Sequence, residues 1–128
     1  MQKNKITLEE AKKSVLNDYR IVVESREASL LGRKEVLTGK AKFGIFGDGK
    51  EVPQLALNHF FKNGDFRSGY YRDQTILMAQ GLLSISNIFS SLYADLDLER
   101  EPMSGGRQMG GHFVTPSRSN TGKWLNLM

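Results

Sequence analysis

The chain contains no cysteine among its 128 residues. Disulfide bridges and thiolate metal sites are therefore excluded. Because a lack of disulfides is typical of cytoplasmic proteins, we expect a cytoplasmic location. Histidine is scarce as well. Because His59 and His112 are the only two histidines and lie far apart in the sequence, no zinc site is expected.

Long apolar runs are also missing. No stretch approaches the roughly 20 apolar residues that cross a bilayer, and residues 2–5 are polar or basic, unlike the apolar core of a signal peptide. The net charge of +4 is mild and scattered along the chain. We therefore expect neither a membrane nor a nucleic acid as the partner, although the charge permits an anionic ligand.

What is present is mainly helical periodicity. Thr7 and Glu10 have the spacing of a capping box. The apolar residues that follow at helical spacing are Leu8, Ala11, Val15, Tyr19, Val22, Leu30 and Leu31. Residues 1–32 are predicted to hold one long amphipathic helix that ends at Gly32, with its apolar stripe in the core or in a subunit interface.

Residues 43–94 are predicted to form a helical core with short strands. Residues 43–46 read as extended, residues 47–49 as a turn, and Pro53 suits the first turn of a helix that ends at residues 63–64. A short helix is predicted over residues 74–80, and Ser84 or Ser86 is expected to cap another. The residues expected on the buried faces are Val52, Leu55, Ala56, Phe60 and Phe61 of the first helix and Ile85, Ile88, Phe89 and Leu92 of the last.

Residues 95–128 begin as an acidic connector, which Pro102 closes. Residues 103–128 contain no acidic residue and are predicted to be a glycine-rich loop with little regular structure, so no sheet is expected within this chain. Trp124 and Leu125 look like the start of another element that needs burial. We infer that the chain is a piece of a longer polypeptide or one member of an assembly.

The stretch from Asp65 to Asp73 combines aromatic and charged residues between two helical segments. Asp73 is a good N-cap, so Tyr71 and Arg72 are expected in a strand end or turn where a helix begins. The amino terminus of a helix and an arginine fork both suit phosphate or carboxylate oxygens. The alternative is that Tyr70 and Tyr71 are packing residues and that Arg72 pairs with Asp73 or Asp65.

A second candidate is the stretch Gly105-Gly106-Arg107-Gln108-Met109-Gly110-Gly111-His112-Phe113. Paired glycines present backbone amides to an anion, and a histidine serves as an acid, a base or a hydrogen-bond donor. The alternative is a flexible loop with an exposed arginine and an incidental histidine.

Gly47-Asp48-Gly49 invites comparison with a magnesium ligand beside a diphosphate, but a simple turn is the better interpretation. Residues 44–49 also fail the dinucleotide-binding fingerprint, because the glycine spacing is wrong and no long strand precedes them. His59 lies on a predicted helix and is expected to be an exposed or interface residue.

Residues 47–52, 69–73 and 105–113, in this order, together resemble the amino-terminal part of the alpha subunit of thiamine-diphosphate-dependent 2-oxo acid dehydrogenases, in particular the branched-chain (2-oxoisovalerate) type. The similarity runs from about residue 27 to residue 115. It implies that Arg72 contacts the cofactor diphosphate and that Tyr71 lines the cofactor pocket. His112 would be the catalytic residue, facing the reacting centre, and Gln108 and Met109 would shape the cofactor site around it.

The resemblance further implies that the chain is a mostly α fragment of an α/β thiamine-diphosphate-binding fold, with short extended segments and a glycine-rich loop tail. In that family the magnesium motif follows the third stretch. Gly47-Asp48-Gly49 precedes it and is therefore a decoy, so no metal ligand is predicted in this chain and Mg²⁺ would be held elsewhere in the complete enzyme.

The partners that the resemblance implies are a beta subunit or fused beta domain, a lipoyl acyltransferase component and a small 2-oxo acid, within a homo- or hetero-oligomeric multienzyme complex of branched-chain amino acid catabolism. The complete enzyme would decarboxylate the 2-oxo acid and transfer the acyl group to the lipoyl carrier, whereas the fragment alone would be inactive. A second hypothesis is a non-catalytic module for protein contacts or weak nucleic-acid binding, whose signature would be a steep loss of nucleic-acid binding with salt.

Overall fold

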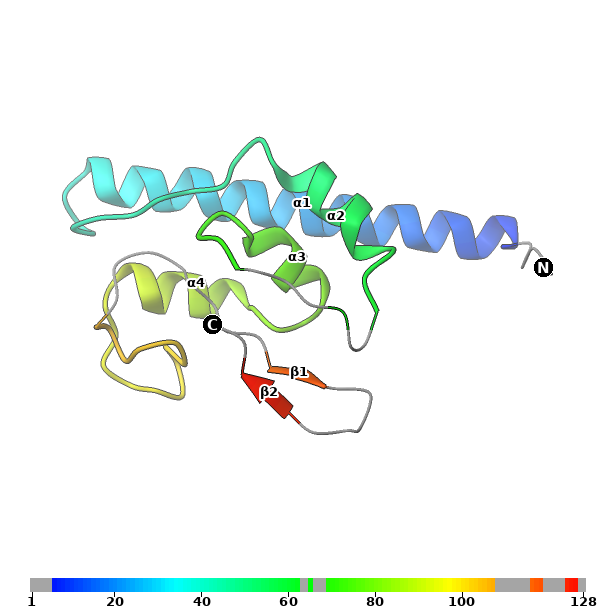
Figure 1. Cartoon of the computed structure of the whole chain (residues 1–128). Helices are drawn as coiled ribbons and strands as arrows, with labels where there is room; N and C mark the ends of the chain where they lie inside the picture. The colour runs from blue at the N-terminus through cyan, green and yellow to red at the C-terminus, as the bar shows by residue number, and fades with distance from the viewer. Residues whose placement is uncertain (1–5, 63–64, 66–68, 108–115, 119–123, 127–128) are drawn as a thin grey trace.

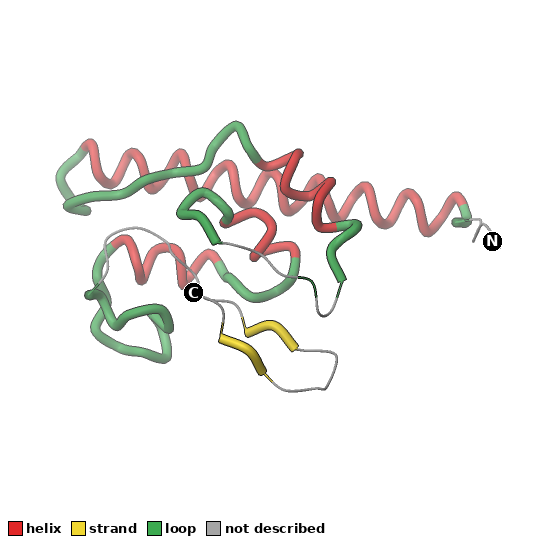
Figure 2. The backbone as a smooth tube through the Cα atoms, viewed as in Figure 1, coloured by secondary structure: helices red, strands yellow, loops and turns green. Residues whose placement is uncertain are grey.

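The computed structural model describes residues 6–62, 65, 69–107, 116–118 and 124–126. The elements, in chain order, are α1 (Leu8–Leu37), α2 (Glu51–Asn58), α3 (Gln74–Ala79), α4 (Ile85–Leu92), β1 (Pro116–Arg118) and β2 (Trp124–Asn126). The described part is mostly helical, as predicted, and this content by itself identifies no fold family. Figures 1 and 2 show α1 along one side of the molecule, with the other helices beside it and its N-terminal part projecting beyond them.

Local capping signals set where α1 begins. The Thr7 hydroxyl accepts a hydrogen bond from the Glu10 N–H (3.3 Å), and the Glu10 carboxylate accepts one from the Thr7 N–H (2.8 Å), which confirms the capping box. The predicted end at Gly32 is wrong, because the helix continues to Leu37. A Cβ on Gly32 would lie 2.4 Å from Cε1 of Phe46, so this glycine makes room for an aromatic ring instead of ending the helix.

The face of α1 that is covered is built largely from small side chains. Its buried residues are Ile21, Ser25, Ala28, Ser29, Gly32 and Glu35. The predicted apolar stripe is wrong as a core face, because Leu8, Val15 and Tyr19 are exposed. The periodicity shows that a helix has an apolar side, but the buried residues of α1 lie on a different side. The following helices also leave the first turns of α1 uncovered (Figure 1).

The core lies where α3 and the segment after it meet the other helices. Ile76, Leu77 and Leu83 form a buried cluster, against which Met78 and Ile88 pack. Of the five residues predicted to be buried on the helix that corresponds to α2, only Leu55 is fully buried. Val52 is exposed, and so is Phe60, which lies beyond the end of α2. This helix is also shorter than predicted: it starts at Glu51 and ends at Asn58.

The predicted cap of α4 is confirmed at Ser84, whose hydroxyl accepts from the Asn87 N–H (3.1 Å). On the face predicted to be buried, Ile88, Phe89 and Leu92 are half-buried and Ile85 is exposed. No β-strand forms at residues 43–46, which the structure describes as irregular.

The glycine-rich tail contains a small antiparallel sheet. Strands β1 and β2 pair with Pro116 opposite Asn126 and Arg118 opposite Trp124. The prediction of a loop without any sheet is therefore wrong for these six residues. Each strand is three residues long, which is too short for an alternating pattern to be recognised in the sequence.

Candidate functional site

The candidate site is centred on the turn that directly precedes α3. The Asp73 N–H donates to the Tyr70 carbonyl (3.0 Å), and the Tyr70 N–H donates to the Asp73 carboxylate (2.9 Å). The predicted turn at the start of a helix is confirmed. The predicted capping bond is wrong: within the described part of the chain, the Asp73 carboxylate makes no cap to α3, because it closes the preceding turn.

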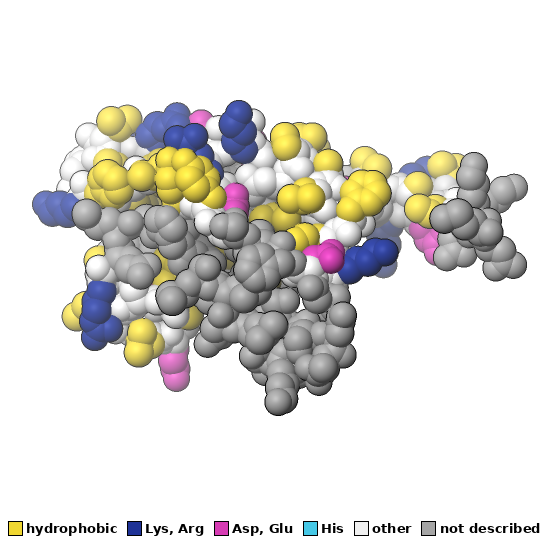
Figure 3. All heavy atoms as spheres, in the orientation of Figure 1, with side chains coloured by type: hydrophobic (Ala, Val, Ile, Leu, Met, Phe, Trp, Pro, Cys, Tyr) yellow, Lys and Arg dark blue, Asp and Glu magenta, His cyan; other side chains and the backbone are white. Residues whose placement is uncertain are grey.

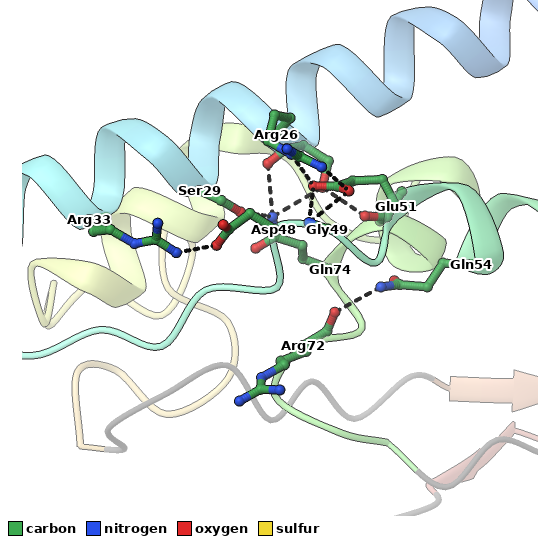
Figure 4. A network of polar contacts seen from close by, with 11 residues as sticks. Arg26, Ser29, Arg33, Asp48, Gly49, Glu51, Gln54, Arg72 and Gln74 are labelled. Atoms are coloured by element: carbon green, nitrogen blue, oxygen red, sulfur yellow. Dashed lines mark hydrogen bonds and ion pairs between the residues drawn. The ribbon is translucent and has the colours of Figure 1, made fainter.

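The main chain of Arg72 is fixed from two sides. Gln54 of α2 donates from Nε2 to the Arg72 carbonyl (3.0 Å). A Cβ on Gly47 would lie 2.7 Å from the same carbonyl oxygen, so this packing requires a glycine. The Arg72 side chain is exposed and points away from the polar network behind it, as Figure 4 shows.

The side chains of this turn form a small aromatic and cationic surface. The ring centroids of Tyr70 and Tyr71 lie 4.0 Å apart, and the Tyr70 hydroxyl donates to the Tyr71 hydroxyl (2.6 Å). This hydrogen bond raises the pKa of Tyr70 above its ordinary value. The guanidinium carbon of Arg72 lies 5.2 Å from the centre of the Tyr71 ring, within the range of a cation–π contact. An exposed guanidinium beside phenol hydroxyls suits an anion with several oxygens.

A polar network behind the turn joins the start of α2 to α1 (Figure 4). Arg26 donates from Nε and Nη2 to the Glu51 carboxylate (2.7 and 2.8 Å), and the Gly49 N–H also donates to that carboxylate. Glu51 is only 2% exposed, and its hydrogen bonds with Arg26 hold its pKa at about 2. The first turn of α2 is thereby anchored to the middle of α1.

The predicted turn at Gly47-Asp48-Gly49 is confirmed, and the Asp48 carboxylate pairs with Arg33 of α1. The described residues contain no group of three or more His, Asp or Glu side chains placed to hold a metal ion.

A second polar cluster, which the sequence reasoning missed, joins α1 to α3. Gln74 donates from Nε2 to the Ser29 hydroxyl (2.6 Å) and to the Ser25 carbonyl (2.9 Å), and the hydroxyls of Ser25 and Thr75 lie 2.7 Å apart. All four side chains are buried. The signal for this face was the run of small residues at positions 25, 28, 29 and 32, whose spacing is that of one helical face.

Part of the glycine-rich stretch also binds an anion, but one within the chain. The Glu101 carboxylate accepts hydrogen bonds from the N–H groups of Ser104 (2.8 Å) and Gly106 (3.0 Å) and is 1% exposed. Burial raises the pKa of Glu101, but the hydrogen bonds from Gly106 and Ser104 lower it by more, so that it lies below its ordinary value. The amide of Gly106 is therefore engaged by an internal carboxylate.

Of the predicted site residues, Tyr71 and Arg72 lie together in the turn described above, whereas Gln108, Met109 and His112 lie outside the described residues. His59 is exposed, as expected, and its Nε2 lies 2.6 Å from the Asp18 carboxylate of α1.

No protein-family model, curated protein or solved structure matches the chain. In the described segments, no helix combines the length and the apolar character that crossing a bilayer requires.

Proposed function

We propose that the chain forms the alpha-subunit side of a thiamine diphosphate site in a 2-oxo acid dehydrogenase, most similar to the branched-chain type. The order of the three sequence stretches supports this proposal. The observation that carries it is the exposed Arg72 guanidinium, presented beside Tyr71 on a turn whose main chain is fixed by Gln54 and Gly47.

The side chains of this turn fit a diphosphate group. A guanidinium offers forked N–H donors to phosphate oxygens, and the adjacent aromatic ring offers an apolar wall. In the proposed enzyme Arg72 binds and orients the diphosphate, and Tyr71 lines the pocket beside it. When bound, thiamine diphosphate supplies the carbon nucleophile and the electron sink for decarboxylation of the 2-oxo acid.

The proposal gives the remaining predicted residues supporting roles. His112 is the proton donor or acceptor beside the substrate, and Gln108 and Met109 shape the cofactor site. A beta subunit or beta domain completes the site, the Mg²⁺ ligands come from outside this chain, and the acyl group passes to the lipoyl group of an acyltransferase. On this proposal the 128-residue chain by itself has no dehydrogenase activity.

The test is a calorimetric titration of the complete enzyme with thiamine diphosphate and Mg²⁺. Arg72→Ala is expected to raise the Kd of the cofactor about 30-fold, the loss of about 2 kcal/mol that removal of a charge-assisted contact brings. Arg72→Lys should recover part of the affinity, because it keeps the charge but not the fork.

Arg20→Ala is the matched control, since Arg20 is an exposed arginine on α1 outside the candidate site. An unchanged Kd in Arg72→Ala would show that Arg72 does not bind the diphosphate. Absence of cofactor binding by the complete wild-type enzyme would reject the proposed function as a whole.

A further inference from the structure

The amino terminus of α3 is capped by a residue that is distant in the sequence. Ile76 is the third residue of α3, and its N–H is one of the donors that a helix cannot satisfy internally. This N–H donates to Oε1 of Gln54 (3.1 Å), a residue of α2 twenty-two positions earlier. Gln54 therefore caps α3 by accepting from a first-turn N–H, a role that the side chain at the N-cap position commonly has. The Asp73 carboxylate instead accepts from the Tyr70 N–H.

The same amide group also holds Arg72, in the turn before the helix. While Oε1 of Gln54 accepts from Ile76, Nε2 donates to the Arg72 carbonyl at 3.0 Å. The side chains of Asn and Gln are the ones that carry an amide donor and an amide acceptor on one carbon. Asn is one methylene shorter, so the bridge from α2 to both groups needs the length of Gln.

Gly47 encloses the Arg72 carbonyl from another direction. An added Cβ would lie 2.7 Å from this oxygen and 3.3 Å from Arg72 Cα, which shows how closely the two backbones approach. With Gln54 and Gly47 on either side, the main chain of Arg72 has little freedom, and the origin of its side chain is fixed relative to α3.

We propose that Gln54 is a positioning residue for Arg72: its amide couples the start of α3 to the Arg72 main chain and so sets where the guanidinium meets an anionic ligand. This inference rests on the proposed function, because the ligand used to test it is thiamine diphosphate. Gln54 itself does not touch the ligand and acts through Arg72.

Two substitutions remove one or both hydrogen bonds of the bridge. Gln54→Glu keeps an acceptor for Ile76 N–H but replaces the donor to the Arg72 carbonyl with an oxygen, which is repelled. Gln54→Met has a similar length and removes both bonds. The expected result is a roughly tenfold rise in the cofactor Kd for each variant of the complete enzyme, with kcat at saturating cofactor changed less than twofold.

A double-mutant cycle with Arg72→Ala measures whether the two substitutions are coupled in the cofactor Kd, which a purely structural role of Gln54 would not produce. If Gln54 acts through Arg72, Gln54→Glu should add almost nothing to the Kd of Arg72→Ala. Ser84→Ala is the control, because it removes a helix cap at α4, away from the turn, and should lower stability without altering the cofactor Kd.

Additive effects of Gln54→Glu and Arg72→Ala, or an unchanged Kd in both Gln54 variants, would overturn the inference while leaving the proposed function intact. Loss of cofactor binding in the wild type would instead reject the proposed function. Circular dichroism and urea unfolding of each variant identify any variant that fails to fold, and Gly47→Ala then provides an independent displacement of the same carbonyl.

Discussion

At the scale of single residues, carboxylates of this chain organise its turns. Glu51 accepts from Gly49 and Arg26, and Glu101 accepts from Ser104 and Gly106. Glycine-rich segments are expected to bind anions because their amides are accessible. In both turns the anion is a buried side chain of the same molecule, which makes these carboxylates sensitive points for stability.

Glu51 is expected to make the stability of the fold depend on pH. Its pKa is about 2 in the folded chain and 4.5 ordinarily, so the folded state binds its proton more weakly than the unfolded chain. The stabilisation, about 3 kcal/mol, is present above pH 5 and is lost as the pH falls from about 5 to about 2. Urea unfolding measured across this range should show the loss.

The matching substitution is Glu51→Gln, which leaves Arg26 without its carboxylate and should cost about 3 kcal/mol at pH 7. In this variant the fall in stability between pH 5 and pH 2 should be clearly smaller. The exposed Glu9→Gln serves as the control. An equal pH dependence in Glu51→Gln and the wild type would contradict the assignment.

Glu101→Ala is expected to release the loop that follows α4. The N–H groups of Ser104 and Gly106 lose their acceptor, and the predicted loss is about 2 kcal/mol in the free energy of unfolding. The Gly106 amide should also exchange its hydrogen faster than in the wild type. Removing the exposed Glu99 carboxylate should change neither quantity, and slow exchange at Gly106 in Glu101→Ala would count against the role of Glu101.

At the scale of elements, the ends of helices follow local chemistry only where no tertiary contact competes with it. Thr7 and Ser84 cap their helices as predicted, because each capping bond involves residues three apart. Gly32 does not end α1, which continues to Leu37, and the Phe46 ring occupies the space that a Cβ on Gly32 would fill.

Gly32→Ala provides a test in which two effects oppose each other. Alanine favours a helix interior by about 1 kcal/mol over glycine, but its Cβ would collide with the Phe46 ring at a cost of about 1–3 kcal/mol. We expect a net loss of stability in the wild-type background. In a Phe46→Ala background the collision is absent, so the same substitution should stabilise. An equal effect of Gly32→Ala in both backgrounds, measured by urea unfolding, would rule out this explanation.

At the scale of the whole molecule, the side of α1 that is covered decides which apolar residues contribute to the core. Leu8, Val15 and Tyr19 repeat at helical spacing yet are exposed, whereas Ser25 and Ser29 are buried beneath α3. Small side chains allow this approach, and their hydroxyls satisfy the Gln74 amide.

Val15→Ser is therefore expected to change the free energy of unfolding of the 128-residue chain by less than about 0.5 kcal/mol. Leu77→Ala, in the buried cluster, should cost about 3 kcal/mol. Urea unfolding at one low protein concentration compares the two. A large loss in Val15→Ser would mean that the predicted apolar stripe is covered after all.

The candidate site was accessible to sequence reasoning only in part. Tyr71 and Arg72 stood out because aromatic and cationic residues precede a helix start, and the structure places them in a turn at that position. Gln54 gave no local signal, since its partners lie 18 and 22 positions later, Arg72 in the turn before α3 and Ile76 in α3 itself. A positioning contact of this kind arises from packing between helices, which a pattern of neighbouring residues does not contain.

By itself, the sequence determined the features that depend on neighbours a few positions apart. These are the mostly helical content, the caps at Thr7 and Ser84, the turn at residues 47–49, the start of a helix after Asp73, and the lack of cysteine ligands. The tertiary structure alone decided the continuation of α1 past Gly32, the burial of Ser25 and Ser29 in place of Val15, the internal use of the Gly106 amide, and the bridge from Gln54 to Arg72. The physical reason is the separation in sequence of the residues that interact. Capping and turn formation are local equilibria, whereas burial and shared hydrogen bonds depend on which distant segments pack together.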